Sequence, residues 1–197
     1  MRDVSASAPV RLVLASGSPR RRALLEALGV AFEVHPADVD ETPHAHEAPE
    51  PMARRLAGAK AAAVATRRAG ALVLAADTVV VLDGEALGKP RDVDENRRFL
   101  ERLAGRWHQV ITAHHLVHGP HERAVAITTE VRLRDLGARE VARWSASGAG
   151  LDKAGGYAIQ DLGAALVADV RGCYTNVVGL SLPAVVREAA RLGVELV

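Results

Sequence analysis

The sequence predicts an α/β fold built on a mixed, curved β-sheet. In the first half of the chain, short apolar runs typical of buried strands alternate with stretches of helical periodicity. In the second half, residues 107–117 and 125–133 have the length and alternation of two paired strands. Ligands in such folds bind beyond the carboxyl ends of the strands, where loops and helix starts converge.

The first strand is predicted over residues 10–15, an apolar run that ends in a loop of small residues. Ser18 is a suitable N-cap for the helix that follows, and Gly29 closes that helix. A second short strand is expected over residues 30–35, before a polar loop from 36 to 49.

Residues 51–69 are rich in alanine and arginine and predict a helix that Gly70 closes. The expected apolar face of this helix consists of Met52, Leu56, Ala59, Ala63 and the nearby Val64. A buried strand over 71–76 should then deliver Asp77 and Thr78 at its end.

Further along, the Asp83-Gly84 pair lies between two short apolar runs and predicts a β-hairpin. Asp92 and Glu95 form a capping box for a helix that extends to Leu103. The remaining expected elements are strands over 107–117 and 125–133, a helix over 136–145, a Gly-rich loop over 148–163, a strand over 164–170 and a last helix from Ser181 to Gly193.

The size and composition are those of a globular protein. With 197 residues, the chain can form one domain with a full hydrophobic core. Its 49% apolar and 25% charged residues exclude a disordered chain. The formal net charge is +1, so any nucleotide must be bound through local charge. We expect residues 1–9 to be a flexible extension and residues 10–197 to form the single domain.

Cysteine usage and hydropathy indicate a cytoplasmic protein. Cys173 is the only cysteine, which excludes an intrachain disulfide and a cysteine-based zinc site. It lacks an identifiable base, which favours a buried, inert thiol over a nucleophile. No apolar run reaches 18 residues, and residues 1–9 lack the apolar core of a signal peptide, so we expect no membrane segment.

The first candidate site is the loop that leads from residue 15 to 22. Small residues expose backbone N–H groups there, and the start of the following helix adds a partial positive charge. Arg20 and Arg21 lie in the first helical turn, where cations are disfavoured unless an anion is nearby. This loop can hold a triphosphate, or it is an ordinary strand–turn–helix connection with solvated arginines.

Acidic residues suggest a second and a third candidate. Asp77 follows a run of buried apolar residues, where a carboxylate is costly to desolvate without a partner. In a cleft it could bind a metal ion or activate a water molecule, and otherwise it caps a loop. The acidic stretch 38–42 can hold Mg²⁺ through oxygen atoms, or it is a solvated loop.

Two more candidates are basic or amide-bearing. Lys89 is one of only three lysines and follows the predicted hairpin, which could direct it at phosphates; otherwise it is a surface lysine. The glycines of the segment 153–160 permit a close approach of the backbone to a ligand. Gln160 at its end offers a donor and an acceptor for the edge of a base.

The histidines lack a partner set with the spacing of a metal site. His108, His114 and His118 are expected on one exposed face of a strand, as structural or surface groups. No P-loop, Rossmann fingerprint, H-E-x-x-H or G-x-S-x-G motif is present.

Taken together and in order, these segments resemble the Maf family of nucleotide pyrophosphatases. The resemblance covers nearly the whole chain from about Val10 onward. The segments that carry it are Leu14-Ala15-Ser16-Gly17-Ser18-Pro19-Arg20-Arg21, Asp40-Glu41, Ala76-Asp77-Thr78-Val79-Val80, Gly88-Lys89-Pro90, Asp152-Lys153-Ala154-Gly155-Gly156-Tyr157-Ala158-Ile159-Gln160 and Tyr174-Thr175-Asn176-Val177-Val178-Gly179-Leu180.

The resemblance implies the fold of inosine triphosphate pyrophosphatases, an elongated mixed sheet with two lobes around a cleft. It also implies a homodimer that hydrolyses a nucleoside triphosphate to the monophosphate and pyrophosphate with a divalent metal ion, which is Mg²⁺, Mn²⁺ or Co²⁺. In this chain Asp77 matches the proton acceptor, and Glu41 matches an acidic residue near the metal, which Asp77 would help to bind. The matching phosphate-binding groups are Ser16, Arg20, Arg21 and Lys89.

The resemblance also implies a substrate. Arg20, Thr78 and Gln160 match the branch that takes dTTP and UTP, with modified pyrimidine nucleotides as further substrates. The branch that acts on 7-methyl-GTP has motifs like S-P-W-R, S-D-Q and S-E-G, which this chain lacks. Asp161 stands where the family commonly has glycine, which leaves the exact preference open.

Two other classes of function compete with this one. A nucleotide-sensing protein would bind the same ligand without turnover, but a pure binder has no need of a water-activating carboxylate such as Asp77. A nucleic-acid-binding module would need a basic stripe with aromatic residues, yet the chain has six aromatic residues and a net charge of +1. We therefore expect a nucleoside triphosphate as ligand, and neither nucleic acid nor membrane as partner.

Overall fold

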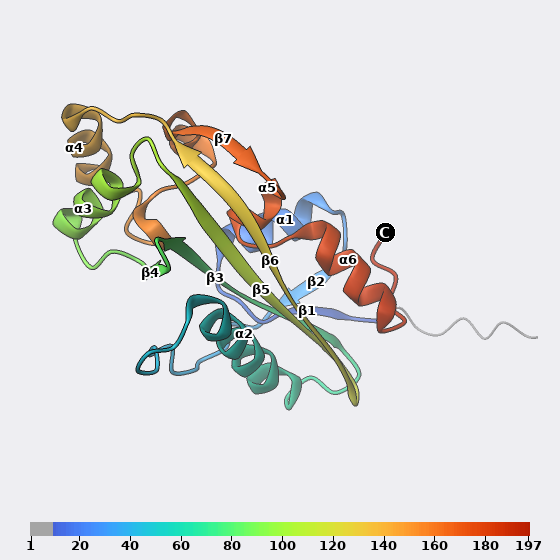
Figure 1. Ribbon diagram of the computed structural model, residues 1–197. Coiled ribbons are helices and arrows are strands. Elements are labelled where there is room, and N and C mark those ends of the chain that lie inside the picture. Colours follow the sequence, from blue (N-terminus) through green and yellow to red (C-terminus); the bar gives the residue numbers. More distant parts are fainter. Residues whose placement is uncertain (1–9) are drawn as a thin grey trace, which may run out of the picture.

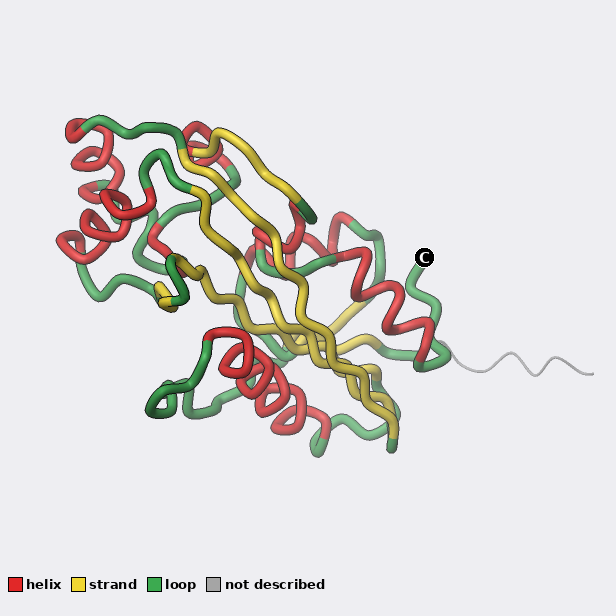
Figure 2. Tube along the Cα trace, viewed as in Figure 1, coloured by secondary structure: helices red, strands yellow, loops and turns green. Residues whose placement is uncertain are grey.

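The computed structural model describes residues 10–197, which form a seven-stranded mixed sheet flanked by helices (Figures 1 and 2). The strand order is β2-β1-β3-β5-β6-β7, and β4 pairs with β3. In chain order the elements are β1 (Leu12–Leu14), α1 (Pro19–Ala27), β2 (Phe32–Val34), α2 (Pro49–Ala65), β3 (Leu72–Leu82), β4 (Glu85–Leu87), α3 (Val93–Leu103), β5 (Trp107–His118), β6 (His121–Leu133), α4 (Ala138–Ala146), the 3₁₀ helices η1 (Ala154–Gly156) and η2 (Asp161–Leu166), β7 (Val167–Arg171), α5 (Tyr174–Val178) and α6 (Leu182–Arg191).

The sheet confirms the predicted α/β class and explains the elongated shape. β1 pairs in parallel with both β2 and β3, and every other pair is antiparallel. β5 and β6 pair over their whole length, from Trp107↔Arg132 to His118↔His121, and Figure 1 shows them as a long diagonal hairpin.

The two faces of β3 pack against different helices, because successive side chains of a strand point to opposite faces. Odd-numbered residues such as Val73 and Val79 lie in clusters with the alanines of α2. Even-numbered residues face the other side, where Leu74 packs with α1 and α6 and Leu82 packs with α3 and α4. Within residues 10–197, no helix has both the length and the hydrophobicity that are needed to cross a bilayer.

The predicted apolar face of α2 is confirmed at Leu56 and Val64, which are buried, and wrong at Ala59. Ala59 is exposed, whereas Ala57 and Ala61 are buried and pack against the sheet. Lys60 lies on the same buried face, with 8% of its surface exposed. The helix also begins at Pro49 and ends at Ala65, four residues before the predicted end.

The expectation that Asp77 and Thr78 end a strand is also wrong. β3 continues to Leu82, so both residues lie in the middle of the strand. The turn at Asp83-Gly84 is confirmed, because both residues have positive φ and connect β3 to β4.

Other differences concern the second half of the chain. The expected strand over 164–170 is confirmed only from Val167 onward as β7, because residues 164–166 form the end of the 3₁₀ helix η2. α5 was not predicted.

The expected exposure of the strand histidines is also wrong for two of them. His108 and His114 are buried at 3% and 1% exposure, and only His118 is partly exposed. They share a face of β5 as predicted, but α5, α6 and η1 cover that face.

Candidate functional site

The site lies where β3 lacks a neighbouring strand on one side. β1 pairs with β3 only as far as Leu74, and β4 takes up the same edge at Val80. The residues between them, 75–79, are strand-paired only on the side of β5. This gap exposes Asp77 and Thr78 to a cleft although they lie inside a central strand.

A cavity of about 580 Å³ opens at this gap. This volume lies within the usual range for pockets that bind small ligands. The cavity brings together all the site residues that the sequence predicts: Ser16, Arg20, Arg21, Glu41, Asp77, Thr78, Lys89 and Gln160. One wall comes from the start of α1 and from α2, and the other comes from the segment around η1, so the predicted cleft is present.

A buried lysine joins the two acidic candidates. The Nζ of Lys60 lies 2.7 Å from Oδ1 of Asp77 and 2.8 Å from Oε1 of Glu41. Asp77 is 9% exposed, so Lys60 provides the positive charge that a desolvated carboxylate requires. Lys60 also lowers the pKa of Glu41, although partial burial opposes this effect.

The sequence prediction did not select Lys60, although it lines the cavity and contacts both acidic candidates. It lies within an alanine-rich helix whose buried face could not be aligned from the pattern alone. The signal that could have identified it is the scarcity of lysine, because the chain has only three and Lys89 was selected on that ground.

Arg21 connects the loop between β1 and α1 to β3 and to Gly179, which directly follows α5. Its Nε donates to the carbonyl oxygen of Gly179 at 2.8 Å, and Nη1 and Nη2 donate to the hydroxyls of Ser16 at 3.0 Å and Thr78 at 3.1 Å. Burial lowers the pKa of Arg21, and the nearby charge of Asp77 opposes this shift. Because arginine is not deprotonated in proteins, the guanidinium stays charged, and its three hydrogen bonds fix it in the cavity.

The Thr78 side chain is also held by residues of the buried core behind the cavity. Its hydroxyl lies 3.0 Å from that of Thr112 on β5, which in turn donates to the carbonyl oxygen of Asn176 at 2.9 Å. Both Thr112 and Asn176 are fully buried, so the orientation of the Thr78 hydroxyl is set by the core.

Arg20 bridges the mouth of the cleft. Its Nη1 donates to Oδ2 of Asp152 at 2.8 Å, and Lys153 contacts the other oxygen of that carboxylate at 2.5 Å. Partial burial raises the pKa of Asp152, but the hydrogen bonds from Lys153 and Arg20 outweigh it and lower the pKa to about 2. The acidic group remains ionised under all ordinary conditions.

The segment that carries Gln160 is anchored by buried polar contacts. The carbonyl oxygen of Gly156 accepts hydrogen bonds from Asn96 and from the indole of Trp144, each at 2.8 Å. The hydroxyl of Tyr157 lies 2.7 Å from Nε2 of His108. Asp161 has a φ of 53°, a left-handed conformation that suits glycine and that aspartate tolerates better than most residues.

Lys89 lies just beyond β4, exposed at the rim of the cavity. Among the described residues it has no ion-pair partner, although its charge also lowers the pKa of Glu41. An unpaired cation at the edge of a polar cavity is available for an anionic ligand.

Glu41 and Asp77 can hold a divalent cation only together with oxygen atoms of a bound ligand such as a phosphate. Within residues 10–197, no group of three histidine, cysteine or acidic side chains is arranged to bind a metal ion. Glu41 and Asp77 nevertheless converge on one ammonium group, so the structure places two carboxylates around a single positive charge. Mg²⁺ is commonly held by one or two carboxylates together with substrate phosphates.

Chemically, the cavity combines two kinds of groups. Cations and hydroxyls line the side formed by α1 and by the rim, where they can neutralise a phosphate chain. Asp77, whose Oδ1 is paired with Lys60, offers its other carboxylate oxygen to the cavity as a proton acceptor or metal ligand.

Comparison with known proteins identifies a family and several relatives of this chain. The model of the protein family described as "Maf-like protein" matches residues 11–192. A protein of Myxococcus xanthus described as "dTTP/UTP pyrophosphatase" is 52% identical over 185 residues, which cover 94% of each chain. A protein of Thermomicrobium roseum with the same description is 52% identical over 87% of this chain and 79% of the relative. Among solved structures, the Ham1 protein of Staphylococcus aureus matches 64% of this chain and 72% of its own, with 18% identity and a TM-score of 0.46.

Proposed function

This chain belongs to the Maf family, and on that premise we propose that it is a nucleoside triphosphate pyrophosphatase that hydrolyses dTTP and UTP to the monophosphate and pyrophosphate. The names of its relatives in Myxococcus xanthus and Thermomicrobium roseum support this substrate class. The observation that carries the proposal is a single cavity in which the two carboxylates joined by Lys60 face the cations of α1 and of the rim.

In this proposal, the cationic and hydroxyl side chains that line the cavity bind the triphosphate. Arg21 is already fixed by three hydrogen bonds, so its remaining donor capacity is oriented before the substrate arrives. Ser16, Arg20 and Lys89 complete the set of phosphate-binding groups in this proposal. A bound divalent cation, held by Glu41 and Asp77, would neutralise charge on the phosphates.

Asp77 performs the proton transfer in the proposed reaction. Its carboxylate accepts a proton from a water molecule as the water oxygen bonds to the α-phosphorus. The bond from that phosphorus to the bridging oxygen breaks, and pyrophosphate leaves with the electron pair. Lys60 donates to Oδ1 of Asp77 and so orients the carboxylate, which leaves the other oxygen for the water.

Recognition of the base is assigned to Arg20, Thr78 and Gln160. The amide of Gln160 can pair with N3–H and with a carbonyl oxygen of uracil or thymine. The hydroxyl of Thr78 and the guanidinium of Arg20 are each held in place by neighbouring residues. In the same proposal the enzyme is a cytoplasmic homodimer.

The test is release of pyrophosphate from a panel of nucleoside triphosphates, with and without Mg²⁺, Mn²⁺ or Co²⁺. We expect metal-dependent turnover with preference for dTTP and UTP. Preference for 7-methyl-GTP would contradict the substrate assignment but keep the reaction. Binding without turnover of any nucleotide would overturn the enzyme assignment in favour of a nucleotide sensor.

A further inference from the structure

We propose that Arg55 is a positioning residue: it fastens the loop 35–48 to α2 and thereby places the carboxylate of Glu41 beside Lys60. This inference rests on the proposed function, in which Glu41 belongs to the metal-binding pair. Arg55 itself lies outside the cavity and contacts neither Asp77 nor any phosphate-binding group.

The loop needs such an attachment because it contains no helix or strand between β2 and α2. Residues 38–46 are exposed apart from the partly buried Val39, so the hydrophobic core contributes little to their order. Among the described residues, the hydrogen bonds and ion pairs from 36–47 to other elements all come from two side chains of α2, Arg55 and Lys60.

Arg55 makes the larger share of these contacts. Its Nε and Nη2 donate to the two oxygens of Glu47 at 2.7 and 2.6 Å, a bidentate pair that fixes the angle as well as the distance. Nη2 also donates to the carbonyl oxygen of Thr42 at 3.2 Å. Since Thr42 directly follows Glu41, this contact acts on the backbone next to the carboxylate that must be placed.

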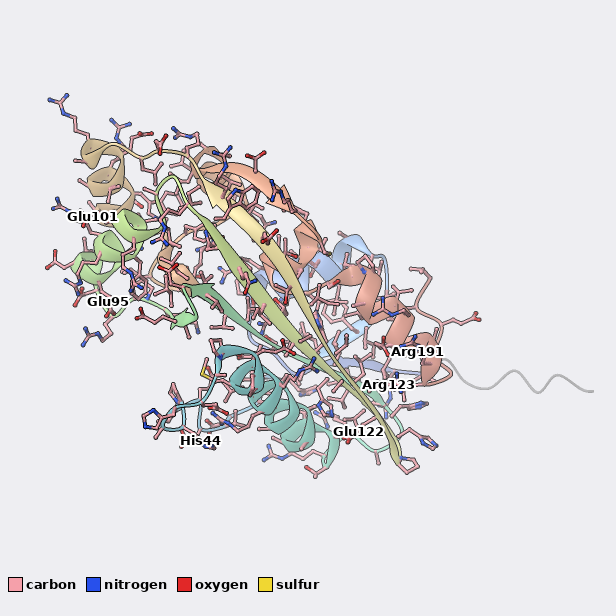
Figure 3. The ribbon with its side chains drawn as sticks, viewed as in Figure 1. His44, Glu95, Glu101, Glu122, Arg123 and Arg191 are labelled. Carbon is pink, nitrogen blue, oxygen red and sulfur yellow. The ribbon has the colours of Figure 1, made fainter. Side chains whose placement is uncertain are left out.

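Hydrogen bonds within the loop also stabilise the residues that Arg55 contacts. The second oxygen of Glu47 accepts the backbone N–H of His44 at 3.1 Å, and Asp40 accepts the N–H of Thr42 at 2.9 Å. Figure 3 shows His44 in the loop that projects beyond the start of α2. Both ends of the segment 42–47 are therefore tied to one guanidinium.

The neighbouring arginine provides a matched control. Arg54 forms an ion pair with Glu50 at 2.8 Å, but both residues belong to α2 and their side chains are 43% and 44% exposed. The pair formed by Arg55 and Glu47 is more enclosed, with exposures of 28% and 11%. Arg54 and Arg55 thus differ in whether the ion pair reaches the loop.

The first experiment measures hydrogen–deuterium exchange of the loop in Arg55→Gln and Arg54→Gln, without nucleotide or metal. We expect exchange of peptides from 38–48 to accelerate about tenfold in Arg55→Gln, because the loop loses its attachment, and to stay unchanged in Arg54→Gln. Glu47→Gln should act like Arg55→Gln. Unchanged exchange in Arg55→Gln would overturn the proposal whether or not the protein hydrolyses nucleotides.

The second experiment asks whether Arg55 acts through Glu41. We expect Arg55→Gln to lower kcat/KM for dTTP about tenfold and Arg54→Gln to lower it less than twofold. Once Glu41→Gln is present, adding Arg55→Gln should cause almost no further loss, because the group to be positioned is already gone. Additive losses would show that Arg55 acts by another route. An inactive wild-type enzyme would refute the proposed function and leave the exchange result to decide the role of Arg55.

Discussion

One ammonium group, that of Lys60, compensates two carboxylates of the site. Asp77 is nearly buried, whereas the side chain of Glu41 is about half exposed at 54%, so the two partners depend on Lys60 to different degrees. Removing one partner of a buried ion pair leaves a charge without compensation, which costs more than the pair itself contributes.

For Lys60→Met we expect the free energy of unfolding to fall by about 2 kcal/mol, because Asp77 loses its cation in a poorly solvated position. Turnover should fall as well, since the two carboxylates then repel each other. Urea unfolding and pyrophosphate release measure both effects. Lys60→Arg keeps the charge and serves as the control, and a Lys60→Met variant as stable as the wild type would show that water solvates Asp77 adequately.

Asp77→Asn tests the proton acceptor. The amide keeps the size of the side chain and removes its basicity, so we expect kcat to fall at least about 100-fold. The circular dichroism spectrum should remain that of the wild type, because the strand around this residue is paired with β5 throughout. Near-wild-type kcat would refute the role of Asp77 as the base.

At the scale of elements, the segment η1 shows how closely the cavity wall is packed. Gly156 has a φ of 73°, and a Cβ there would lie 1.9 Å from Nδ2 of Asn96. Gly70 has nearly the same φ, 76°, but a Cβ there would meet no atom within 4 Å. Comparing alanine substitutions at Gly70 and Gly156 therefore distinguishes the free-energy cost of a left-handed backbone from the cost of a steric clash.

We expect Gly70→Ala to lower the free energy of unfolding by about 1 kcal/mol, the usual cost of this backbone conformation. Gly156→Ala should cost roughly 2 kcal/mol more, because Asn96 must give up its hydrogen bond to the wall. Urea denaturation of both variants provides the comparison. Equal losses would mean that α3 moves aside without penalty.

The elements also show what the sequence could and could not predict. Strands and turns with local signals were located correctly, as at residues 10–15 and at Asp83-Gly84. The prediction for α2 is right at Leu56 and Val64 but wrong at Ala59, because alanine marks no preferred side of a helix, and the direction of Lys60 depends on tertiary packing. The sequence predicts Asp77 at a strand end because desolvating a carboxylate inside a central strand is unfavourable. In the structure, the gap between β1 and β4 exposes this carboxylate to the cavity and so lowers that cost.

The candidate site was easier to predict than the contacts that support it. The predicted site residues lie in short motifs, which local sequence reveals, and all of them line one cavity. The supporting contacts join distant segments, as between Tyr157 and His108, and no local pattern indicates them. The alternation of side chains along a strand correctly predicted that the histidines of β5 share one face. It could not show that helices from later in the sequence cover that face.

At the scale of the whole molecule, we expect the buried His108 and His114 to make the free energy of unfolding depend on pH. Burial lowers the pKa of His108 to about 4, and burial together with the charge of Arg21 does the same for His114. In the unfolded chain both titrate near 6.5, so below that pH protons bind the unfolded state first. Stability should therefore fall as the pH drops from 6.5 to about 4, by up to roughly 3 kcal/mol for each histidine.

His114→Gln tests this expectation, because glutamine keeps an acceptor for the N–H of Ser181 and cannot titrate. Its free energy of unfolding should depend about half as steeply on pH within that window as that of the wild type. The exposed His121 gives the control, since His121→Gln should leave the dependence unchanged. An unaltered slope in His114→Gln would mean that this histidine is not kept neutral by the fold.

The sheet order also has a consequence for the route by which the chain folds. β5 and β6 are connected by Gly119-Pro120 and pair next to that turn, whereas β1 and β3 pair only after α1, β2 and α2 have closed a long loop. Formation of the hairpin can thus precede formation of the cavity, which needs both ends of that loop. In refolding experiments we expect the fluorescence change of Trp107 on β5 to come before the recovery of catalytic activity. Simultaneous recovery would instead indicate a single cooperative step, so the delay measures how late a newly synthesised molecule becomes an enzyme.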